Sequence, residues 1–315
     1  MIDLSTRYLG LSLAGPIVVS ASPLSRSLDD VRAMEDAGAA AVVLQSAFEE
    51  QFEALDNVAA DAYLEHLRRV KAAVGMPVIG SINGVSTGWW IEFAKKIEHA
   101  GADALELNIH YLPTDPTLTG ARVERMYTDL VRDVKRRVSI PLAVKLDYSF
   151  TALANVAHQL DVVGADGLVL FNRSYLPDFD LERFQVVPRM TPSRPYELLV
   201  RLHWVAVLFG QVKADLAVTG GVQGSAQVVK AILAGARVVM MTSALLQNGI
   251  SYLARVRADI VDWMETHGWI SIAQMRGRMR YRSVTDPAAF ERANFMKVLS
   301  AFARRTPPSI SPPSG

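Results

Sequence analysis

A lysine inside an apolar run is the strongest chemical signal in the sequence. In the segment IPLAVKLD, Leu142, Val144 and Leu146 alternate with other residues, and Lys145 lies among them. Neighbouring residues of a strand point to opposite faces, so Lys145 should lie on the face opposite the three apolar side chains. Burying an ammonium group is costly unless the group meets an anion or an electron-rich ligand. We therefore expect either a functional lysine or a buried ion pair, for which Glu106 is a candidate partner.

Three amide side chains end other apolar runs along the chain. They are Asn83, Asn108 and Asn172. Each amide offers both a hydrogen-bond donor and an acceptor. One such asparagine is commonly a turn or cap residue. Three that converge suit a small planar substrate with carbonyl and N–H edges.

Two further pairs of residues indicate a site for a phosphate group. Gly220 and Gly221 follow one apolar run, and Thr242 and Ser243 follow the next. Glycines let backbone N–H groups approach an anion, and hydroxyl groups add further donors. The alternative is a plain turn followed by a helix cap. The phosphate interpretation gains weight if the two runs are the last two strands of a barrel.

A weak internal repeat predicts how these residues are positioned. Four segments share a helix end, a glycine and an apolar run, and their glycines are Gly38, Gly101, Gly164 and Gly235. A strand and its helix take roughly 30 residues, and these glycines lie about two such units apart. The units between them are also visible, so eight strands are expected, at 17–22, 41–46, 77–83, 104–109, 141–147, 167–172, 215–221 and 237–243.

Eight strands that alternate with helices predict a (β/α)8 barrel, the TIM-barrel fold. An open doubly wound sheet is the alternative, but no G-x-G-x-x-G motif follows the first strand. In a barrel the residues at the carboxyl ends of the strands meet at one mouth, where the chemistry takes place. We expect one domain over residues 1–303. The segment 173–195 is long for a strand–helix connection and is expected to cover the site.

Composition excludes several classes of protein. The 315 residues include no cysteine, and their formal net charge is +1. The absence of cysteine excludes disulfides, protein-bound iron–sulfur clusters and thiol nucleophiles. The low net charge provides no strong electrostatic field for binding nucleic acid or an anionic membrane. The six histidines have no familiar metal-ligand spacing, so no metal is expected. No signal peptide or transmembrane run is recognised, which predicts a cytoplasmic protein. Residues 304–315, rich in Pro and Ser, are expected to be a disordered tail.

The sequence resembles the dihydroorotate dehydrogenase family on its class 1 side, most closely a bacterial branch called dihydroorotate dehydrogenase-like. The resemblance covers nearly the whole chain. It is carried, in order, by LGLSLAGPIVVSASPLSRS, VVLQSAFEEQ, ALELNI, PLAVKL, GADGLVLFNR, TGGV and SIAQMRG. It implies a short N-terminal hairpin before the barrel, a C-terminal helical extension, FMN as cofactor and a homodimer. The implied reaction is oxidation of dihydroorotate to orotate in pyrimidine biosynthesis, or of a related small cyclic substrate.

The resemblance also assigns residues to the site. It implies that the FMN phosphate lies at the two pairs described above, Gly220–Gly221 and Thr242–Ser243. Substrate contacts are implied for Asn83, Asn108 and Asn172. Contacts with the flavin are implied for Ala21, Ser22, Gln45, Ser46, Asn108 and Lys145. A cation such as Lys145 can stabilise the negative charge that a flavin gains when it accepts a hydride.

Two departures from the family pattern concern the chemistry most directly. Tyr111 occupies the position of the catalytic Cys or Ser base, and a phenol, with an ordinary pKa of about 10, is a poor base at neutral pH. His110 beside it is a weaker candidate. Gln45 replaces a lysine, which removes a positive charge near the flavin. In addition, Pro113 replaces a later Asn of the same loop, and Arg173 stands where the family has Ser or Thr.

The leading hypothesis is thus an FMN-dependent oxidoreductase acting on a CH–CH bond, with Lys145 and Tyr111 as its catalytic residues. A second hypothesis is a lyase that forms a Schiff base through Lys145 with a phosphorylated substrate. A third is a non-catalytic flavin subunit of a redox complex. Because the chain lacks cysteine, any iron–sulfur relay would belong to a separate electron-transfer subunit.

Overall fold

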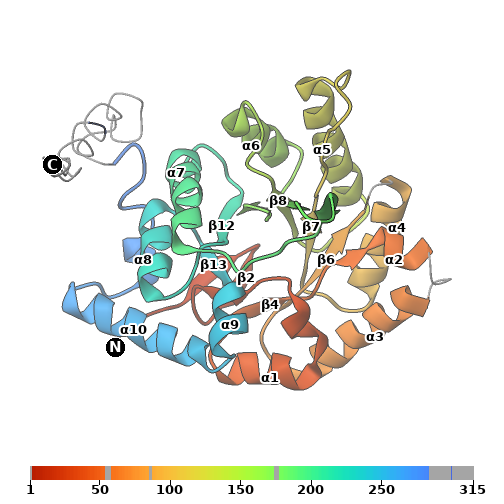
Figure 1. Ribbon diagram of the computed structural model, residues 1–315. Coiled ribbons are helices and arrows are strands. Elements are labelled where there is room, and N and C mark those ends of the chain that lie inside the picture. Colours follow the sequence, from red (N-terminus) through yellow and green to blue (C-terminus); the bar gives the residue numbers. More distant parts are fainter. Residues whose placement is uncertain (1, 54–57, 85–86, 174–176, 284–298, 300–315) are drawn as a thin grey trace, which may run out of the picture.

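The structure is a computed structural model, and it describes residues 2–53, 58–84, 87–173, 177–283 and 299. Within this part of the chain, eight parallel strands close into a barrel (Figure 1). Each of these strands pairs with the next one along the chain, and the ring closes because the last strand pairs with the first. The strands are β3 (Ile17–Val19), β4 (Ala41–Val43), β6 (Val78–Asn83), β7 (Ala104–Asn108), β8 (Leu142–Leu146), β9 (Gly167–Leu170), β12 (Asp215–Thr219) and β13 (Val238–Met241).

Helices surround the barrel on its outer side (Figure 1). The longer ones are α1 (Leu28–Asp36), α3 (Val58–Ala73), α4 (Thr87–His99), α5 (Gly120–Lys135), α6 (Leu153–Val162), α7 (Leu198–Leu208), α8 (Ser225–Ala234) and α10 (Tyr252–Thr266). Short elements lie between them: η1 (Pro23–Arg26), β5 (Ala47–Phe48), α2 (Glu49–Glu53), η2 (Pro195–Glu197), α9 (Ser243–Asn248) and α11 (Ile272–Met275). The predicted (β/α)8 barrel is therefore confirmed. The predicted strands overran the observed ones by one to three residues, mostly at their carboxyl ends.

Alternation along the strands separates two cores. The larger core packs the outward faces of the strands against the helices and includes Leu142, Val144 and Leu146. A smaller core fills the inside of the barrel and includes Ala143 of the same strand. The predicted assignment of faces in β8 is thus confirmed, and it places Lys145 on the inward face.

A hairpin closes the amino-terminal end of the barrel. Strands β1 (Thr6–Tyr8) and β2 (Leu11–Leu13) are antiparallel, and Tyr8, Leu9 and Leu13 belong to the inner core. The Leu9 N–H donates to the carboxylate of Asp215, the first residue of β12, at 3.0 Å, which fixes the hairpin at this end. The hairpin that the family resemblance implied is present.

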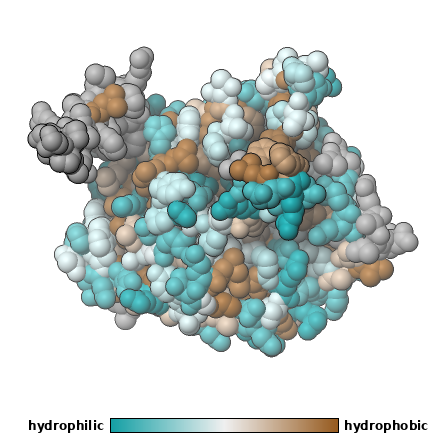
Figure 2. Space-filling model, viewed as in Figure 1, coloured by the Kyte–Doolittle hydropathy of each residue, from teal (hydrophilic) through white to brown (hydrophobic). Residues whose placement is uncertain are grey.

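The long connection after β9 contains a second hairpin, formed by β10 (Asp178–Asp180) and β11 (Gln185–Val187). Its apolar side chains Phe179, Leu181 and Phe184 are largely exposed. Hydrophobic patches are set among hydrophilic side chains on the face shown in Figure 2. Further along the same connection, Ser193 is buried against the turns that follow β12 and β13. The predicted covering segment therefore reaches the site through Ser193.

The C-terminal extension begins with α10 and α11 and then crosses the outer helices. Its backbone N–H groups at Gly277 and Met279 donate to two carbonyls of α8, and the Tyr281 N–H donates to a carbonyl of α7. The predicted extension is therefore present as far as residue 283. The end of the predicted domain at residue 303 and the predicted tail, 304–315, lie outside the described residues. Among the described helices, none has the length and apolar character needed to cross a membrane.

We expect the N-terminal hairpin to contribute strongly to stability. Leu13 is 3% exposed inside the barrel, so Leu13→Ala should lower the free energy of unfolding by about 2–4 kcal/mol. Leu199→Ala on α7, where the side chain is 67% exposed, should change it by less than about 0.5 kcal/mol. Chemical denaturation of both variants measures the difference. Equal effects would show that the hairpin does not plug the barrel.

Candidate active site

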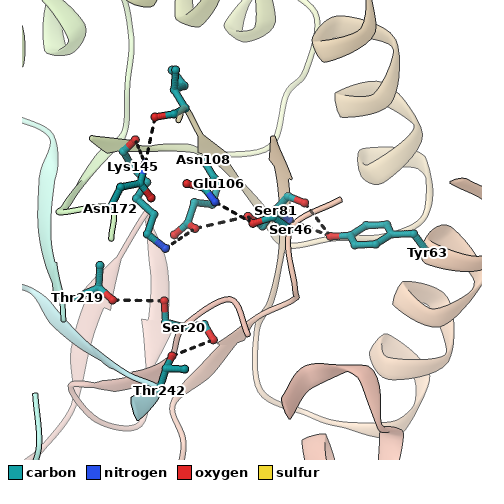
Figure 3. Close-up of polar contacts among 11 residues, drawn as sticks. Ser20, Ser46, Tyr63, Ser81, Glu106, Asn108, Lys145, Asn172, Thr219 and Thr242 are labelled. Atoms are coloured by element: carbon teal, nitrogen blue, oxygen red, sulfur yellow. Dashed lines mark hydrogen bonds and ion pairs between the residues drawn. The ribbon is translucent and has the colours of Figure 1, made fainter. Parts of the chain in front are cut away.

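Lys145 and Glu106 meet inside the barrel mouth. The Lys145 ammonium on β8 lies 3.4 Å from Oε1 of Glu106 on the adjacent strand β7. The two side chains are 9% and 1% exposed and point toward each other (Figure 3). The sequence left open whether Lys145 is a site residue or part of a buried ion pair. The structure shows that it is paired with Glu106 and that it also lies near the carboxyl end of its strand.

A line of hydrogen bonds runs from this pair across the floor of the mouth. Ser81 Oγ on β6 lies 3.5 Å from Glu106 Oε1 and 2.9 Å from Ser46 Oγ. Asn108 Nδ2, at the end of β7, donates to Ser46 Oγ at 3.1 Å. The line therefore runs from Asn108 to Ser46, both predicted site residues, and then through Ser81 and Glu106 to Lys145 (Figure 3). Ser81 was not predicted, although its spacing of two from Asn83 in β6 puts both on one face.

Four buried side-chain atoms lack a hydrogen-bond partner among the described residues. One is Tyr8 Oη, in the hairpin at the amino-terminal end. The other three lie on or just after strands of the barrel: Ser22 Oγ, Glu106 Oε2 and Asn108 Oδ1. Native proteins leave few such atoms unsatisfied, because each costs free energy unless a ligand or water completes its bonding. Ser22 and Asn108 are both predicted flavin contacts. Together with the Lys145 ammonium they provide a set of donors and acceptors for a polar ligand.

The predicted phosphate site is partly occupied by the protein's own chain. Ser193 Oγ accepts from the Gly221 N–H at 3.0 Å, and it lies 3.1 Å from Ser243 Oγ. The Ser193 N–H also donates to Ser243 Oγ at 3.0 Å. The Thr242 hydroxyl donates to the Ser20 carbonyl at 3.5 Å. A phosphate here would have to bind beside Ser193 or displace it.

Packing within the protein explains why positions 220 and 221 are glycines, and the sequence alone did not indicate this. Gly220 and Gly221 have φ of +89° and +75°. A Cβ at Gly220 would lie 2.7 Å from Arg201 Nη2, and one at Gly221 would lie 2.5 Å from the Leu198 backbone nitrogen. The groups that approach this turn closely are thus the Arg201 guanidinium and the backbone at the start of α7.

Arg201 is a buried cation that the sequence analysis missed. Its guanidinium donates to the carbonyls of Thr219 and Glu197, which ties α7 to the turn after β12. Burial lowers the pKa of the guanidinium, with a partly opposing effect from Glu197. An arginine in the otherwise apolar segment LLVRLHWVAVL was the available signal.

Gln45 is bonded to a cation. The Arg26 guanidinium donates to Gln45 Oε1, and the Gln45 N–H donates to Ser25 Oγ at 2.7 Å. These residues line part of a cavity of about 270 Å³ that also includes Ser46. The positive charge that was expected to be lost at position 45 is therefore partly restored by Arg26 from η1.

The other predicted asparagines have different surroundings. Asn172 is 5% exposed, and its Nδ2 donates to the carbonyls of Ile109 and Lys145 at 3.1 and 3.4 Å. Its donor side therefore fixes the ends of β7 and β8, and only its oxygen could serve the substrate contact that was predicted. Asn83 is buried at the end of β6.

The predicted base lies on the rim. Tyr111 is 38% exposed in a segment, 110–117, whose residues are all exposed, including His110. Beneath this segment the Tyr127 hydroxyl lies 3.5 Å from the Ile109 carbonyl. Burial is the main cause that raises the Tyr127 pKa well above its ordinary value, with Asp147 adding to it. Tyr111 is thus outside the buried line that joins Lys145 to Asn108.

Comparison with known proteins decides the family. The model of the family described as dihydroorotate dehydrogenase matches residues 53–264, more than half of the chain. The chain belongs to the dihydroorotate dehydrogenase family. The predicted resemblance is confirmed, and with it the predicted class, a flavin-dependent dehydrogenase.

The relatives agree with this assignment at low sequence identity. The chain is 25% identical over 303 residues to the dihydroorotate dehydrogenase B (NAD(+)) catalytic subunit of Thermoplasma acidophilum, covering 88% of this chain and 99% of the relative. It is 29% identical over 238 residues to the protein of the same name in Geobacter sp. (strain M21), covering 71% and 75%. It is 28% identical over 212 residues to a putative dihydroorotate dehydrogenase A (fumarate) of Aeropyrum pernix, covering 64% and 67%.

The residues at the mouth fit one end of a flavin better than the other. Lys145 and the unpartnered atoms of Ser22 and Asn108 suit the polar edge of the ring, which carries both carbonyl and N–H groups. At the phosphate end, the Gly221 N–H and the Ser243 hydroxyl already bond to Ser193. The ring end fits as it stands, and the phosphate end fits if Ser193 shares or yields its donors.

We expect substitution of Gly221 to be destabilising because of the atoms packed around it and not because of its φ alone. Gly210 has a similar φ, +81°, but a Cβ there meets nothing within 4 Å. Gly210→Ala should therefore cost only the left-handed strain, about 1–2 kcal/mol. Gly221→Ala should cost more and should release bound flavin. Thermal unfolding and the flavin absorbance of the purified variants measure both effects, and equal losses in the two variants would contradict this account of the turn.

Proposed function

We propose that this protein is an FMN-dependent dehydrogenase that oxidises a CH–CH bond of a small cyclic substrate, dihydroorotate or a close relative. The observation that carries the proposal is the buried Lys145 ammonium, whose neighbour across the β7–β8 pairing, Asn108, has an unpartnered amide oxygen. Ser22, just after β3, adds a second unpartnered polar atom. Membership of the dihydroorotate dehydrogenase family supports the same conclusion. FMN, when bound, would supply the hydride acceptor for the reaction.

Lys145 would stabilise negative charge that develops on the acceptor. Its ammonium is 9% exposed, so water screens it weakly and its field acts strongly at short range. Asn108 Oδ1 and Ser22 Oγ would orient the ligand through hydrogen bonds. The Arg26–Gln45 pair supplies a second, more exposed positive group on the same side of the mouth as Ser46.

Proton removal from the substrate would be the slow step of the reaction. The position of the base belongs by resemblance to Tyr111, which lies on the exposed segment 110–117. A phenol accepts a proton efficiently only when it is ionised, so the reaction would be slow at neutral pH. We therefore propose that dihydroorotate turnover is weak near pH 7.

The Schiff-base alternative has less support. An amine must lose its proton before it attacks a carbonyl. The Lys145 ammonium is instead engaged with the Glu106 carboxylate at 3.4 Å. The ion pair therefore favours a role for Lys145 as a fixed positive charge.

We further propose that the protein works as a cytoplasmic homodimer that passes electrons to a separate subunit. The printed names of several relatives call them catalytic subunits, which supports a second kind of subunit. The exposed side chains Phe179, Leu181 and Phe184 support contact with a second copy, because a two-stranded hairpin is marginally stable alone. Two ion pairs, Arg183 with Asp180 and Arg189 with Asp178, neutralise part of the charge at this hairpin, so the face suits a copy of itself.

The test of the proposed function is a visible spectrum of the purified protein, recorded before and after anaerobic addition of dihydroorotate. We expect one FMN per chain and slow bleaching of its absorbance. Lys145→Met should slow bleaching by about 10²-fold, as expected for the loss of one electrostatic stabiliser. Lys135→Met is the matched control, because that lysine also pairs with a carboxylate, Asp166, but lies away from the mouth. A colourless protein, or equal rates in the two variants, would overturn the proposal.

The pH profile tests the assignment of the base. If Tyr111 removes the proton, wild-type turnover should rise toward alkaline pH, since the phenolate fraction increases with pH. Tyr111→Phe should remove this alkaline limb, while Tyr148→Phe, another exposed tyrosine near the mouth, should keep it. Fast turnover at neutral pH that survives in Tyr111→Phe would show that another residue takes the proton.

A further inference from the structure

Glu106 is a buried carboxylate that the proposed reaction does not use. It is fully buried in β7 on the inward face of the barrel. Its Oε1 lies 3.4 Å from Lys145 Nζ and 3.5 Å from Ser81 Oγ, and its Oε2 has no partner among the described residues. A buried carboxylate normally needs close hydrogen bonds, so this group is poorly satisfied.

Other lysine–carboxylate pairs in the protein are built differently. Lys71 lies 2.6 Å from Asp103, and that carboxylate oxygen also accepts from the Val78 N–H at 2.7 Å. Lys135 pairs with Asp166, which accepts from the Leu142 N–H at 2.7 Å. In both pairs the carboxylate ties the start of a strand to the loop before the next strand, and the side chains are 27–37% exposed.

The Lys145–Glu106 pair lacks these features of a structural clamp. Its contacts are long, at 3.4 and 3.5 Å, and both side chains are nearly inaccessible. No backbone N–H in the described part of the chain donates to Glu106. Buried ion pairs contribute little net stability, because desolvation offsets their attraction. The long contact leaves the ammonium free to turn toward a ligand in the mouth.

Among the described residues, the other groups that interact with Glu106 carry no positive charge. Tyr8 lies on the N-terminal hairpin and Tyr63 on α3, and both feel the field of Glu106. Burial is the main cause that raises the pKa of each phenol well above its ordinary value, with Glu106 adding to the shift and Asp215 acting on Tyr8. Both phenols are therefore neutral at physiological pH. Lys145 is the cation that balances Glu106 among the described contacts.

We propose that Glu106 is a positioning residue that controls how much of the Lys145 charge reaches the bound flavin. This inference rests on the proposed function. Without a ligand, Glu106 holds the ammonium on the floor of the mouth. With a flavin bound, the two compete for the same ammonium group, so Glu106 makes the flavin harder to reduce than Lys145 alone would.

The first experiment tests the pairing without any flavin chemistry. It measures the melting temperatures of Glu106→Gln, Lys145→Met and the double variant. Glu106→Gln should lower the melting temperature by on the order of 10 °C, because it leaves a buried ammonium unpaired. In the Lys145→Met background the same substitution should raise it, because it removes an unpaired carboxylate. Equal lowering in both backgrounds would show that Glu106 acts through packing and not through Lys145.

The second experiment measures the midpoint potential of the bound flavin, which a purely structural role would not shift in a set direction. Glu106→Gln should shift it to a more positive value and Lys145→Met to a more negative one. Asp103→Asn, which weakens the Lys71 pair outside the mouth, should leave it unchanged. An unchanged potential in Glu106→Gln, in protein that is folded and loaded with flavin, would overturn the proposal.

The two experiments separate this inference from the proposed function. If the wild-type protein binds no flavin, the proposed function fails and the control of the flavin's charge fails with it. The melting-temperature cycle then still decides whether Glu106 holds Lys145. If flavin binds and bleaches with substrate but Glu106→Gln leaves the potential unchanged, the proposed function stands and only the role of Glu106 is wrong.

Discussion

The buried contact between Lys145 and Glu106 is the constraint on which the mouth of the barrel depends. Two charged side chains inside a low-dielectric interior are tolerated only if they meet, and they can meet only if β7 and β8 are adjacent and in register. The pairing of Asn108 with Lys145 and of Glu106 with Ala143 meets this condition. On the other side of β7, the register with β6 places Ser81 opposite Glu106, and Ser46 bonds to both Ser81 and Asn108. The polar floor therefore depends on the register of β7 with both of its neighbours.

Closure of the barrel makes this arrangement possible. The strands bury apolar residues on their outward faces, and their inward faces carry small residues such as Ala143 and Ala217 in the inner core. Small side chains leave room for Lys145 and Glu106 toward one end, while Tyr8 and Leu9 of the hairpin fill the other end. The barrel thus has an apolar plug at its amino-terminal end and a polar floor near its mouth.

Residue type and alternation were enough to predict the barrel and the inward direction of Lys145, and they gave Glu106 as a possible partner, but they missed Ser81. Those properties are local, because strand alternation and the glycine at each helix end follow from neighbouring residues. Contacts between distant segments could not be predicted this way. Ser193 bonds to Gly221 and Ser243, from a connection that lies far away in the sequence. Arg26 bonds to Gln45 in the same way. Gly220 is needed because α7 places the Arg201 side chain against that turn.

The central claim is that the polar floor around Lys145 binds the ring of a flavin. The most direct measurement is a fluorescence titration of flavin-free protein with FMN, comparing the wild type with Lys145→Met. FMN should bind the variant at least about tenfold more weakly, since the variant loses one charged contact of roughly 1.5 kcal/mol or more. Equal affinity for FMN in the two proteins would contradict this claim, because the flavin would then bind without using the floor.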